Sequence, residues 1–277
     1  MRQSKVLFIG NRTHAVPMIL SDLDAAPTLA VHRGSYAHRE LAHEGWNFDL
    51  FDSREELAEI IRSTKFEILI SEGCPFIIPI SELQRPGQLF INLHPAILPD
   101  HRGPIPVISA MYYFRNAGAT CHMMTDRVDV GPYIAQVPIK LDPSISLELL
   151  YQLSFRAEAK ALKIAIARNF EVAAGIAQAP WRETVFTRRD AIELRDMHLD
   201  MTSGEIEARV RALAIGNRFA TIQVNGQHRM VHATRVLQAS TMNTFYPDTK
   251  PSQIVHAFGE TLIVRTRDEW MALELVP

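Results

Sequence analysis

Three polar side chains in two short segments have the chemical types that move an acyl group onto an amine. Asn92 and His94 lie in residues 90–95, and Asp129 lies in residues 126–131. An amide can donate a hydrogen bond to an oxyanion, an imidazole can exchange a proton, and a carboxylate can orient the imidazole. Together these residue types predict an acyl-transfer site.

The segment around Asn92 and His94 predicts a buried strand that ends in a proline-rich loop. Residues 89–93 are nearly all apolar, and Pro95 and Pro99 stop the strand. Alternate residues of a strand share a face, so Asn92 and His94 point the same way at the carboxyl end, where open α/β sheets usually bind ligands. A buried histidine, a strand-end cap and an Asp-x-Gly turn are structural explanations of the three residues taken singly.

The composition is that of a soluble globular enzyme with no large charge imbalance. The formal net charge of −2 gives no bulk attraction for nucleic acid or for an anionic membrane. The longest apolar runs, such as residues 76–80, are too short to span a bilayer, and residues 1–5 lead into a strand pattern without a signal peptide. Cys74 and Cys121 form no CxxC pair, so no disulfide framework or zinc site is expected. We therefore expect a cytoplasmic protein.

The first half of the chain alternates short apolar runs with stretches of helical periodicity. The expected strands are residues 6–10, 29–32, 66–70 and 89–93, and the expected helices are residues 14–23 and 53–63. This alternation is typical of right-handed βαβ units and predicts an α/β fold with a Rossmann-like, mostly parallel sheet covered on both faces. No GxGxxG pattern follows Gly10 and the chain has no P-loop, so the sheet is not expected to hold a nicotinamide cofactor or a nucleoside triphosphate.

The second half predicts a change of architecture. Two strands (119–124 and 133–139), a long helix (147–169), a linker (180–200) and a helix (203–212) are expected in turn. Four short strands then follow, with an Asn225-Gly226 hairpin between the first two. We expect a catalytic domain over residues 1–190 and a small β-rich domain over residues 200–277, with an OB-like barrel.

Several segments resemble a known family. Residues 92–103 (NLHPAILPDHRG) resemble the NxHPSLLPxYRG signature of the formyltetrahydrofolate-dependent formyltransferases. Residues 118–134 are similar to the G-x-T-x-H…D-x-G-x-I block of that family. Residues 8–17 resemble the FxGTPxFAVP opening of its methionyl-tRNA formyltransferase branch, and residues 211–213 and 225–227 resemble the C-terminal barrel of that branch. The resemblance covers nearly the whole chain.

The resemblance implies a reaction and roles for the three polar residues. The co-substrate would be N10-formyltetrahydrofolate, no metal would be required, and attack of an amine on the formyl carbon would make an oxyanion. Asn92 would donate to that oxygen. His94 would supply positive charge, or a proton for the departing folate nitrogen. Asp129 would orient His94, favour its charged form and relay the proton that leaves the amine.

The family forms its folate pocket from the segment before the asparagine and from the loop that carries the aspartate. Carried over to this chain, the pocket residues are Phe76, Ile77, Ile78, Asp126, Arg127 and Val128. Residues 76–80 also fit an ordinary core segment, and the two descriptions are compatible because a pteridine slot is mostly apolar.

The acceptor side departs from the family pattern. Asn11-Arg12 replaces the family's Thr-Pro, and residues 32–45 lack the long Lys-rich insertion of the tRNA-modifying branch. Residues 200–277 hold eight Lys/Arg and eight Asp/Glu, a balance that makes nucleic acid an unlikely partner. We expect a small-molecule amine acceptor, first of all an amino sugar carried on a nucleoside diphosphate. Its expected binding residues are Asn11, Arg12, His14 and Arg102.

Arg12 and Arg102 are the candidates for contacts with the phosphates of that acceptor. Two alternative acceptors are initiator methionyl-tRNA and an amino acid such as N-hydroxyornithine. A non-enzymatic alternative is a folate-binding protein, against which the complete set of three polar residues argues. A homodimer through the small domain is a further expectation.

Overall fold

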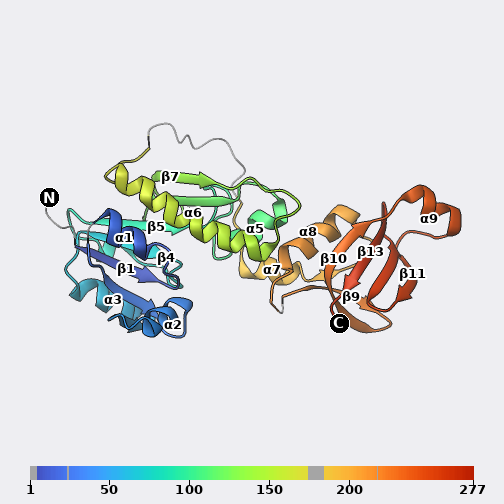
Figure 1. Cartoon of the computed structure of the whole chain (residues 1–277), viewed down its shortest axis with the longest axis horizontal. Coiled ribbons are helices and arrows are strands. Elements are labelled where there is room, and N and C mark those ends of the chain that lie inside the picture. The colour runs from blue at the N-terminus through green and yellow to red at the C-terminus, as the bar shows by residue number, and fades with distance from the viewer. Residues whose placement is uncertain (1–4, 24, 174–183, 217) are drawn as a thin grey trace. The chain divides into compact units, whose positions relative to one another are not determined.

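The computed structural model describes residues 5–23, 25–173, 184–216 and 218–277, which form two compact units (Figure 1). Unit 1 comprises Met1–Pro106, Asn116–Lys140 and Gln152–Val185. Unit 2 comprises Val107–Arg115, Leu141–Tyr151 and Phe186–Pro277. The division at residues 190–200 stays a prediction, and the internal contacts group two earlier segments of the chain with the C-terminal unit.

Unit 1 is built on a seven-stranded sheet in the order β3-β2-β1-β4-β5-β6-β7. The strands are β1 (Val6–Gly10), β2 (Thr28–His32), β3 (Asp49–Phe51), β4 (Ile68–Glu72), β5 (Leu89–His94), β6 (Gly118–Met123) and β7 (Tyr133–Pro138). β1 to β5 pair in parallel, whereas β6 and β7 are antiparallel to their neighbours. The mostly parallel α/β sheet expected from the sequence is therefore confirmed.

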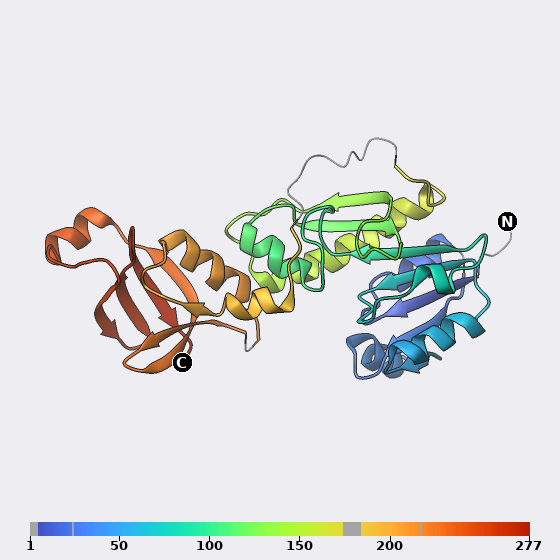
Figure 2. The same ribbon diagram turned by 180° about the vertical axis from the view of Figure 1, so that it is seen from behind.

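Helices cover both faces of this sheet. On one face, Phe8, Ile70 and Leu93 belong to a core cluster that includes residues of α1 (Val16–Asp22), α2 (Tyr36–His43) and α6 (Leu147–Ala167). On the other face, Leu69 and Phe90 pack with residues of α3 (Arg54–Ser63) and α4 (Ile80–Leu83). In Figure 1, α6 lies in front of the sheet, and Figure 2 shows the sheet from behind.

One helix was not expected from the sequence, and one local expectation was wrong. The segment after β2 contains α2, whose N-cap is Ser35: the Ser35 hydroxyl accepts a hydrogen bond from His38 N. The expected linker contains α7 (Arg188–Glu193), which starts with a reciprocal Thr187–Asp190 capping box, and β8 (Asp196–Met197). Local side-chain caps supply order that hydrophobic periodicity does not reveal. Residues 180–183 of that linker lie outside the described residues.

Unit 2 contains a six-stranded sheet in the order β11-β12-β13-β10-β9-β8. Its other elements are α5 (Pro106–Tyr113), α8 (Ser203–Leu213), β9 (Ala220–Val224), β10 (Gln227–Val236), α9 (Ala239–Phe245), β11 (Gln253–Phe258), β12 (Thr261–Arg265) and β13 (Trp270–Leu275). Asn225 and Gly226 take positive φ angles of 51° and 79° between β9 and β10, which matches the hairpin expected there. The OB-like character of this sheet stays a prediction.

A buried ion cluster joins α6 to the sheet of unit 1. Arg12 Nη2, just beyond β1, donates to both carboxylate oxygens of Glu158 on α6, at 2.8 and 2.7 Å. Glu72, the last residue of β4, accepts a hydrogen bond from Ala15 N at 3.0 Å and lies 4.0 Å from Arg12 Nε. Two fully buried carboxyls therefore share one arginine.

This shortage of positive charge changes the proton affinity of the cluster. Burial raises the pKa of Glu72, although Arg12 and the Ala15 amide lower it, and the nearby Glu40 raises it further. Burial also raises the pKa of Glu158, to about 8, against the opposing effect of Arg12 and with a further rise from Glu72. The cluster therefore binds protons at a higher pH than exposed carboxyls do.

We predict that unit 1 loses stability as the pH rises. Both carboxyls have an ordinary value of 4.5, so the folded chain binds more protons than the unfolded chain between that value and about pH 8. The free energy of unfolding should then fall with rising pH, by at most about 1.4 kcal/mol per pH unit for one proton. Urea unfolding at pH 6, 7 and 8 measures this slope.

Glu72→Gln should flatten the slope, because it leaves one carboxylate opposite Arg12 and keeps an oxygen for Ala15 N. Glu67→Gln, at an exposed residue just before β4, is the matched control and should keep the wild-type slope. If the free energy of unfolding has the same pH dependence in the wild type and in Glu72→Gln, Glu72 and Glu158 are not the source of the slope.

Candidate functional site

Asn92, His94 and His122 come together on neighbouring strands. β5 and β6 are antiparallel in a register that places Asn92 opposite His122 and His94 opposite Thr120. Residues directly opposite each other project to the same face of a sheet. Asn92 Nδ2 accordingly lies 3.2 Å from His122 Nε2. The strand pairing therefore adds a third polar side chain to the two expected from β5.

His122 is buried and neutral. Burial, and then the charge of His94, lower the pKa of His122 to about 4. Its Nδ1 lies 2.9 Å from the carbonyl oxygen of Met123, which can only accept, so we assign the ring hydrogen to Nδ1. Nε2 then accepts one N–H of Asn92, and the second N–H of that amide remains for a ligand. The site residues predicted from the sequence did not include His122, although its place in the G-x-T-x-H pattern was the available signal.

His94 is buried between two oxygen acceptors. Nε2 lies 3.0 Å from the carbonyl oxygen of His101, so this nitrogen carries a hydrogen. Nδ1 lies 3.5 Å from Asp129 Oδ1. The ring can therefore donate at both nitrogens when it is protonated, and the positive charge then faces a carboxylate.

Asp129 is brought to His94 by an unusual turn after β6. Its φ angle of 56° lies in the left-handed region, which aspartate tolerates better than most residues. Its Oδ2 accepts a hydrogen bond from Gly103 N at 3.0 Å. The carboxylate thus links the turn to the loop that follows β5, and the structure brings together all three residues expected to be catalytic.

The loop after β5 is held by side chains of β6 and β7. Thr120 Oγ1 donates to Ala96 O at 2.7 Å and accepts from Leu98 N at 3.0 Å, and Gln136 Nε2 donates to Leu98 O at 2.8 Å. His101 in this loop is fully buried, and its carbonyl oxygen faces His94. Buried tethers of this kind hold a loop in one conformation.

The residues expected to bind folate border the same end of the sheet. Ile78 is buried, whereas Ile77 and Val128 are 62% and 48% exposed. Asp126 Oδ1 accepts a hydrogen bond from Ser81 N at 3.0 Å, which ties the loop of residues 126–128 to α4. Exposed aliphatic side chains beside ordered loops are available for contact with an apolar ligand.

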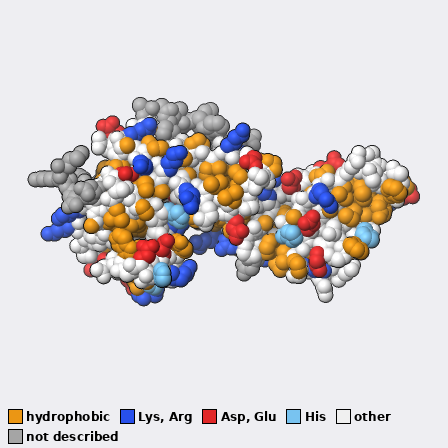
Figure 3. All heavy atoms as spheres, viewed as in Figure 1, with side chains coloured by type: hydrophobic (Ala, Val, Ile, Leu, Met, Phe, Trp, Pro, Cys, Tyr) orange, Lys and Arg blue, Asp and Glu red, His pale blue; other side chains and the backbone are white. Residues whose placement is uncertain are grey.

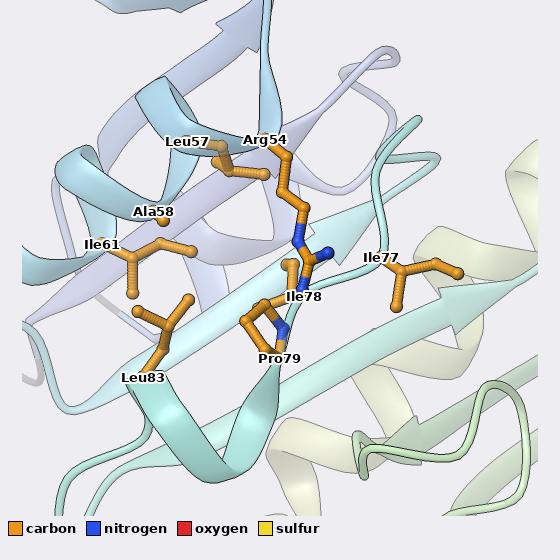
Figure 4. A pocket seen from close by; sticks show the side chains of 8 residues that line it. All are labelled: Arg54, Leu57, Ala58, Ile61, Ile77, Ile78, Pro79 and Leu83. Carbon is orange, nitrogen blue, oxygen red and sulfur yellow. The ribbon is translucent and has the colours of Figure 1, made fainter.

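A shallow apolar hollow continues from this region towards α3 (Figure 4). Arg54 stands at its edge, and its side chain reaches from the start of α3 towards Pro79 (Figure 4). No ion pair joins Arg54 to another of the described residues. The hollow therefore combines an apolar floor with one cation. Its lining residues are Arg54, Leu57, Ala58, Ile61, Ile77, Ile78, Pro79 and Leu83.

The residues expected to bind the acceptor are in two places. Asn11, Arg12 and His14 follow β1, where Arg12 is engaged by Glu158 and stacks over the Phe155 ring at 4.2 Å. Arg102 is half-buried in the loop after β5, and its backbone N–H donates to Thr184 O at 2.8 Å. The structure brings the first three together and places Arg102 beside Gly103, a partner of Asp129.

No group of three or more His, Cys, Asp or Glu side chains in the described ranges is arranged to hold a metal ion. None of the helices in those ranges is long and apolar enough to cross a membrane.

Solved structures share the fold. The N-formyltransferase from Helicobacter canadensis, in complex with folinic acid and dTDP-3-aminofucose, superposes with a TM-score of 0.70 at 15% identity, over 99% of this chain and 100% of that one. A sugar N-formyltransferase from Shewanella sp FDAARGOS_354 superposes with a TM-score of 0.67 at 19% identity, over 84% and 98% of the two chains. At these identities the likeness shows the fold alone.

The sequence is also similar to those of known formyltransferases. Phosphoribosylglycinamide formyltransferase of Bacillus subtilis is 31% identical over 132 residues, covering 47% of this chain and 66% of that protein. Methionyl-tRNA formyltransferase of the same organism is 25% identical over 230 residues, covering 80% of this chain and 69% of that protein. The chain thus spans about two thirds of the length of these relatives. A family model described as formyl transferase matches residues 14–166, more than half of the sequence, and the chain belongs to that family.

Proposed function

We propose that the protein transfers a formyl group from N10-formyltetrahydrofolate to the primary amine of a small molecule. The observation that carries the proposal is the arrangement of Asn92, His94 and Asp129 around one end of β5, in a segment that the family model matches. An oriented amide, an imidazole with two acceptors and a buried carboxylate supply the groups that formyl transfer requires.

The proposed reaction follows from the positions of these groups. The amine nitrogen attacks the formyl carbon and a C–N bond forms, while the carbonyl oxygen becomes an oxyanion that accepts the remaining N–H of Asn92. His94 in its charged form stabilises this oxygen. Collapse of the intermediate breaks the bond to folate N10, which takes a proton. Asp129 and His94 relay the proton that the amine releases, so the enzyme returns to its starting state.

The hollow beside Ile77 and Ile78 suits the outer part of the folate. Its p-aminobenzoyl-glutamate tail joins an apolar ring to carboxylates, which matches an apolar floor with a cation at the edge. We propose that Arg54 meets a tail carboxylate there. The proposed contacts with the remainder of the folate come from Phe76, Ile77, Ile78, Asp126, Arg127 and Val128.

A nucleotide-linked amino sugar is the proposed acceptor. Lys/Arg and Asp/Glu side chains are interspersed on the visible face of unit 2 rather than gathered into a basic patch (Figure 3), which does not favour tRNA. The Helicobacter canadensis neighbour was crystallised with dTDP-3-aminofucose, an acceptor of the proposed class. Arg12 and Arg102 stay the proposed contacts for the phosphates of this acceptor. A cytoplasmic location and a homodimer stay predictions.

The proposal is tested by a turnover assay at saturating N10-formyltetrahydrofolate with dTDP-linked amino sugars, N-hydroxyornithine and bulk tRNA as acceptors. We expect formylation of the sugar nucleotide, and at least about a 100-fold loss of kcat in His94→Ala, with folding and folate binding retained. His43→Ala, at an exposed residue of α2, is the control. Turnover that needs tRNA would disprove the acceptor, and near-normal transfer by His94→Ala would remove His94 from the reaction.

His122 should act by positioning Asn92. His122→Leu removes the acceptor that orients the amide, so we expect about a 10-fold or larger fall in kcat with little change in the KM for folate. His122→Gln, which presents an oxygen acceptor, should restore part of the loss. Steady-state kinetics after a thermal-unfolding check measure both variants. Equal kcat values in the Leu and Gln variants would indicate a packing role instead.

Arg54 should contribute to folate affinity and not to the chemical step. Because Arg54 is exposed, Arg54→Met should raise the KM for N10-formyltetrahydrofolate about two- to fivefold at low salt, with kcat unchanged. The difference should shrink at high ionic strength, where exposed charges are screened. Arg62→Met on the same helix is the matched control. A KM that stays at the wild-type value at low salt would place the folate tail elsewhere.

A further inference from the structure

A second polar site lies where β1 and β4 diverge. Within the sheet, β2 lies on one side of β1 and β4 lies on the other. The strand order therefore reverses between β1 and β4, and their carboxyl ends form the topological switch point. Ligands of open α/β sheets bind in the crevice at such a point. Here it is bordered by Asn11, Arg12 and His14 after β1 and by Glu72 at the end of β4. This position is therefore a candidate ligand site.

The backbone at this point has no room for larger side chains. A Cβ atom on Gly10 would lie 2.4 Å from the Glu72 carbonyl oxygen, and one on Gly73 would lie 2.3 Å from Arg12 Nη1. The two glycines thus allow the polar side chains to crowd into the crevice. Asn11 N also donates to Glu72 O at 3.1 Å, which fixes the start of the loop after β1.

Polar atoms in this crevice are buried without hydrogen-bond partners. Glu72 is fully buried, and its Oε1 makes no hydrogen bond with the described residues, although Oε2 accepts from Ala15 N. Arg12 Nε lies 4.0 Å from Oε1 and His14 Nδ1 lies 3.9 Å from it, distances too long for a hydrogen bond. Asn11 Oδ1 and His14 Nδ1 are also buried and make no hydrogen bond with the described residues. Such groups in a folded protein require an explanation, and a bound ligand is one.

The chemistry of the crevice selects the ligand. Arg12 is held by Glu158 and by the Phe155 ring, whereas Glu72 Oε1 and Asn11 Oδ1 accept no hydrogen bond from the described residues. The unsatisfied oxygens of Glu72 and Asn11 are acceptors. A phosphate diester has no hydrogen to give them, whereas sugar hydroxyls and amines carry the donors that they lack.

We propose that Glu72 Oε1 and Asn11 Oδ1 accept hydrogen bonds from the hydroxyl or amine groups of the acceptor substrate. The amino-polyol part of the acceptor then lies at the ends of β1 and β4, and its phosphates lie outside the crevice. This inference rests on the proposed function and names the part of the acceptor that enters this site. The His14 side chain is 27% exposed, and its Nδ1 lies 3.9 Å from Glu72 Oε1, so the ligand would have to displace this ring to reach the oxygen.

The sheet places this crevice next to the reaction centre. β4 and β5 are neighbours, with Glu72 paired to Leu93, and adjacent strands lie about 4.8 Å apart. The Glu72 side chain shares the face of Leu93, whereas Asn92 and His94 project to the opposite face. A substrate that reaches both must therefore cross the carboxyl ends of the strands, where its amine can meet the formyl carbon.

The test measures acceptor binding by Glu72→Gln, with dTDP-3-aminofucose and dTDP as probes in calorimetric titrations. The amide presents one acceptor oxygen where the carboxyl presents two, so Glu72→Gln should weaken dTDP-3-aminofucose binding about 10-fold or more. The affinity for dTDP alone should not change, and Glu67→Gln should behave as the wild type. Equal weakening of both probes, or wild-type binding of the amino sugar, would overturn the inference.

A second variant guards against a folding defect. Asn11→Ala leaves the ion cluster intact and should also weaken binding of dTDP-3-aminofucose relative to dTDP. Urea unfolding establishes that both variants are folded. If Glu72→Gln is unfolded, Asn11→Ala decides, and wild-type binding by that variant counts against the inference.

The assay also separates this inference from the proposed function. If the wild-type enzyme formylates N-hydroxyornithine or tRNA and not the sugar nucleotide, the proposed acceptor is wrong. The KM of Glu72→Gln for the acceptor that is used then decides the inference: a raised KM supports it and an unchanged KM refutes it. If none of these acceptors is formylated, both statements are wrong.

Discussion

The antiparallel register of β5 and β6 is the constraint on which the reaction centre depends. It places Asn92 opposite His122, so that a neutral imidazole holds the amide through one N–H and leaves the other for a ligand. A shift of the register by one residue would turn His122 to the opposite face of the sheet. Because β5 has core residues on both faces of the sheet, Leu93 on one and Phe90 on the other, that shift would also disrupt core packing, and the fold itself protects the site geometry.

The loop after β5 turns this register into a complete site. Thr120 and Gln136 hold its backbone, the carbonyl oxygen of His101 holds one nitrogen of His94, and Gly103 N holds Asp129. Each tether satisfies a polar group that would otherwise be buried alone, so the loop is stabilised by the same contacts that align the reacting groups. Positioning and stability are not separable here.

The two faces of the sheet differ in the ionisable side chains that they carry. His94 and Asp129 lie together on the face of α3 and α4. The two buried carboxyls of Glu72 and Glu158, which share Arg12, lie on the face of α6. The sequence made this arginine, which follows β1, a candidate for phosphate contacts. The charge of Arg12 was visible in the sequence. Its ion pair with Glu158 was not.

The sequence by itself determined the parallel strands, the hairpin at Asn225-Gly226 and the face shared by Asn92 and His94. These features follow from short-range patterns of burial, turn chemistry and strand alternation. The tertiary structure alone decided that His122 orients Asn92, that His101 is buried against His94, and that Glu158 engages Arg12, which is 146 residues away. Such contacts depend on strand register and helix packing, and no local pattern encodes which distant partner a side chain meets.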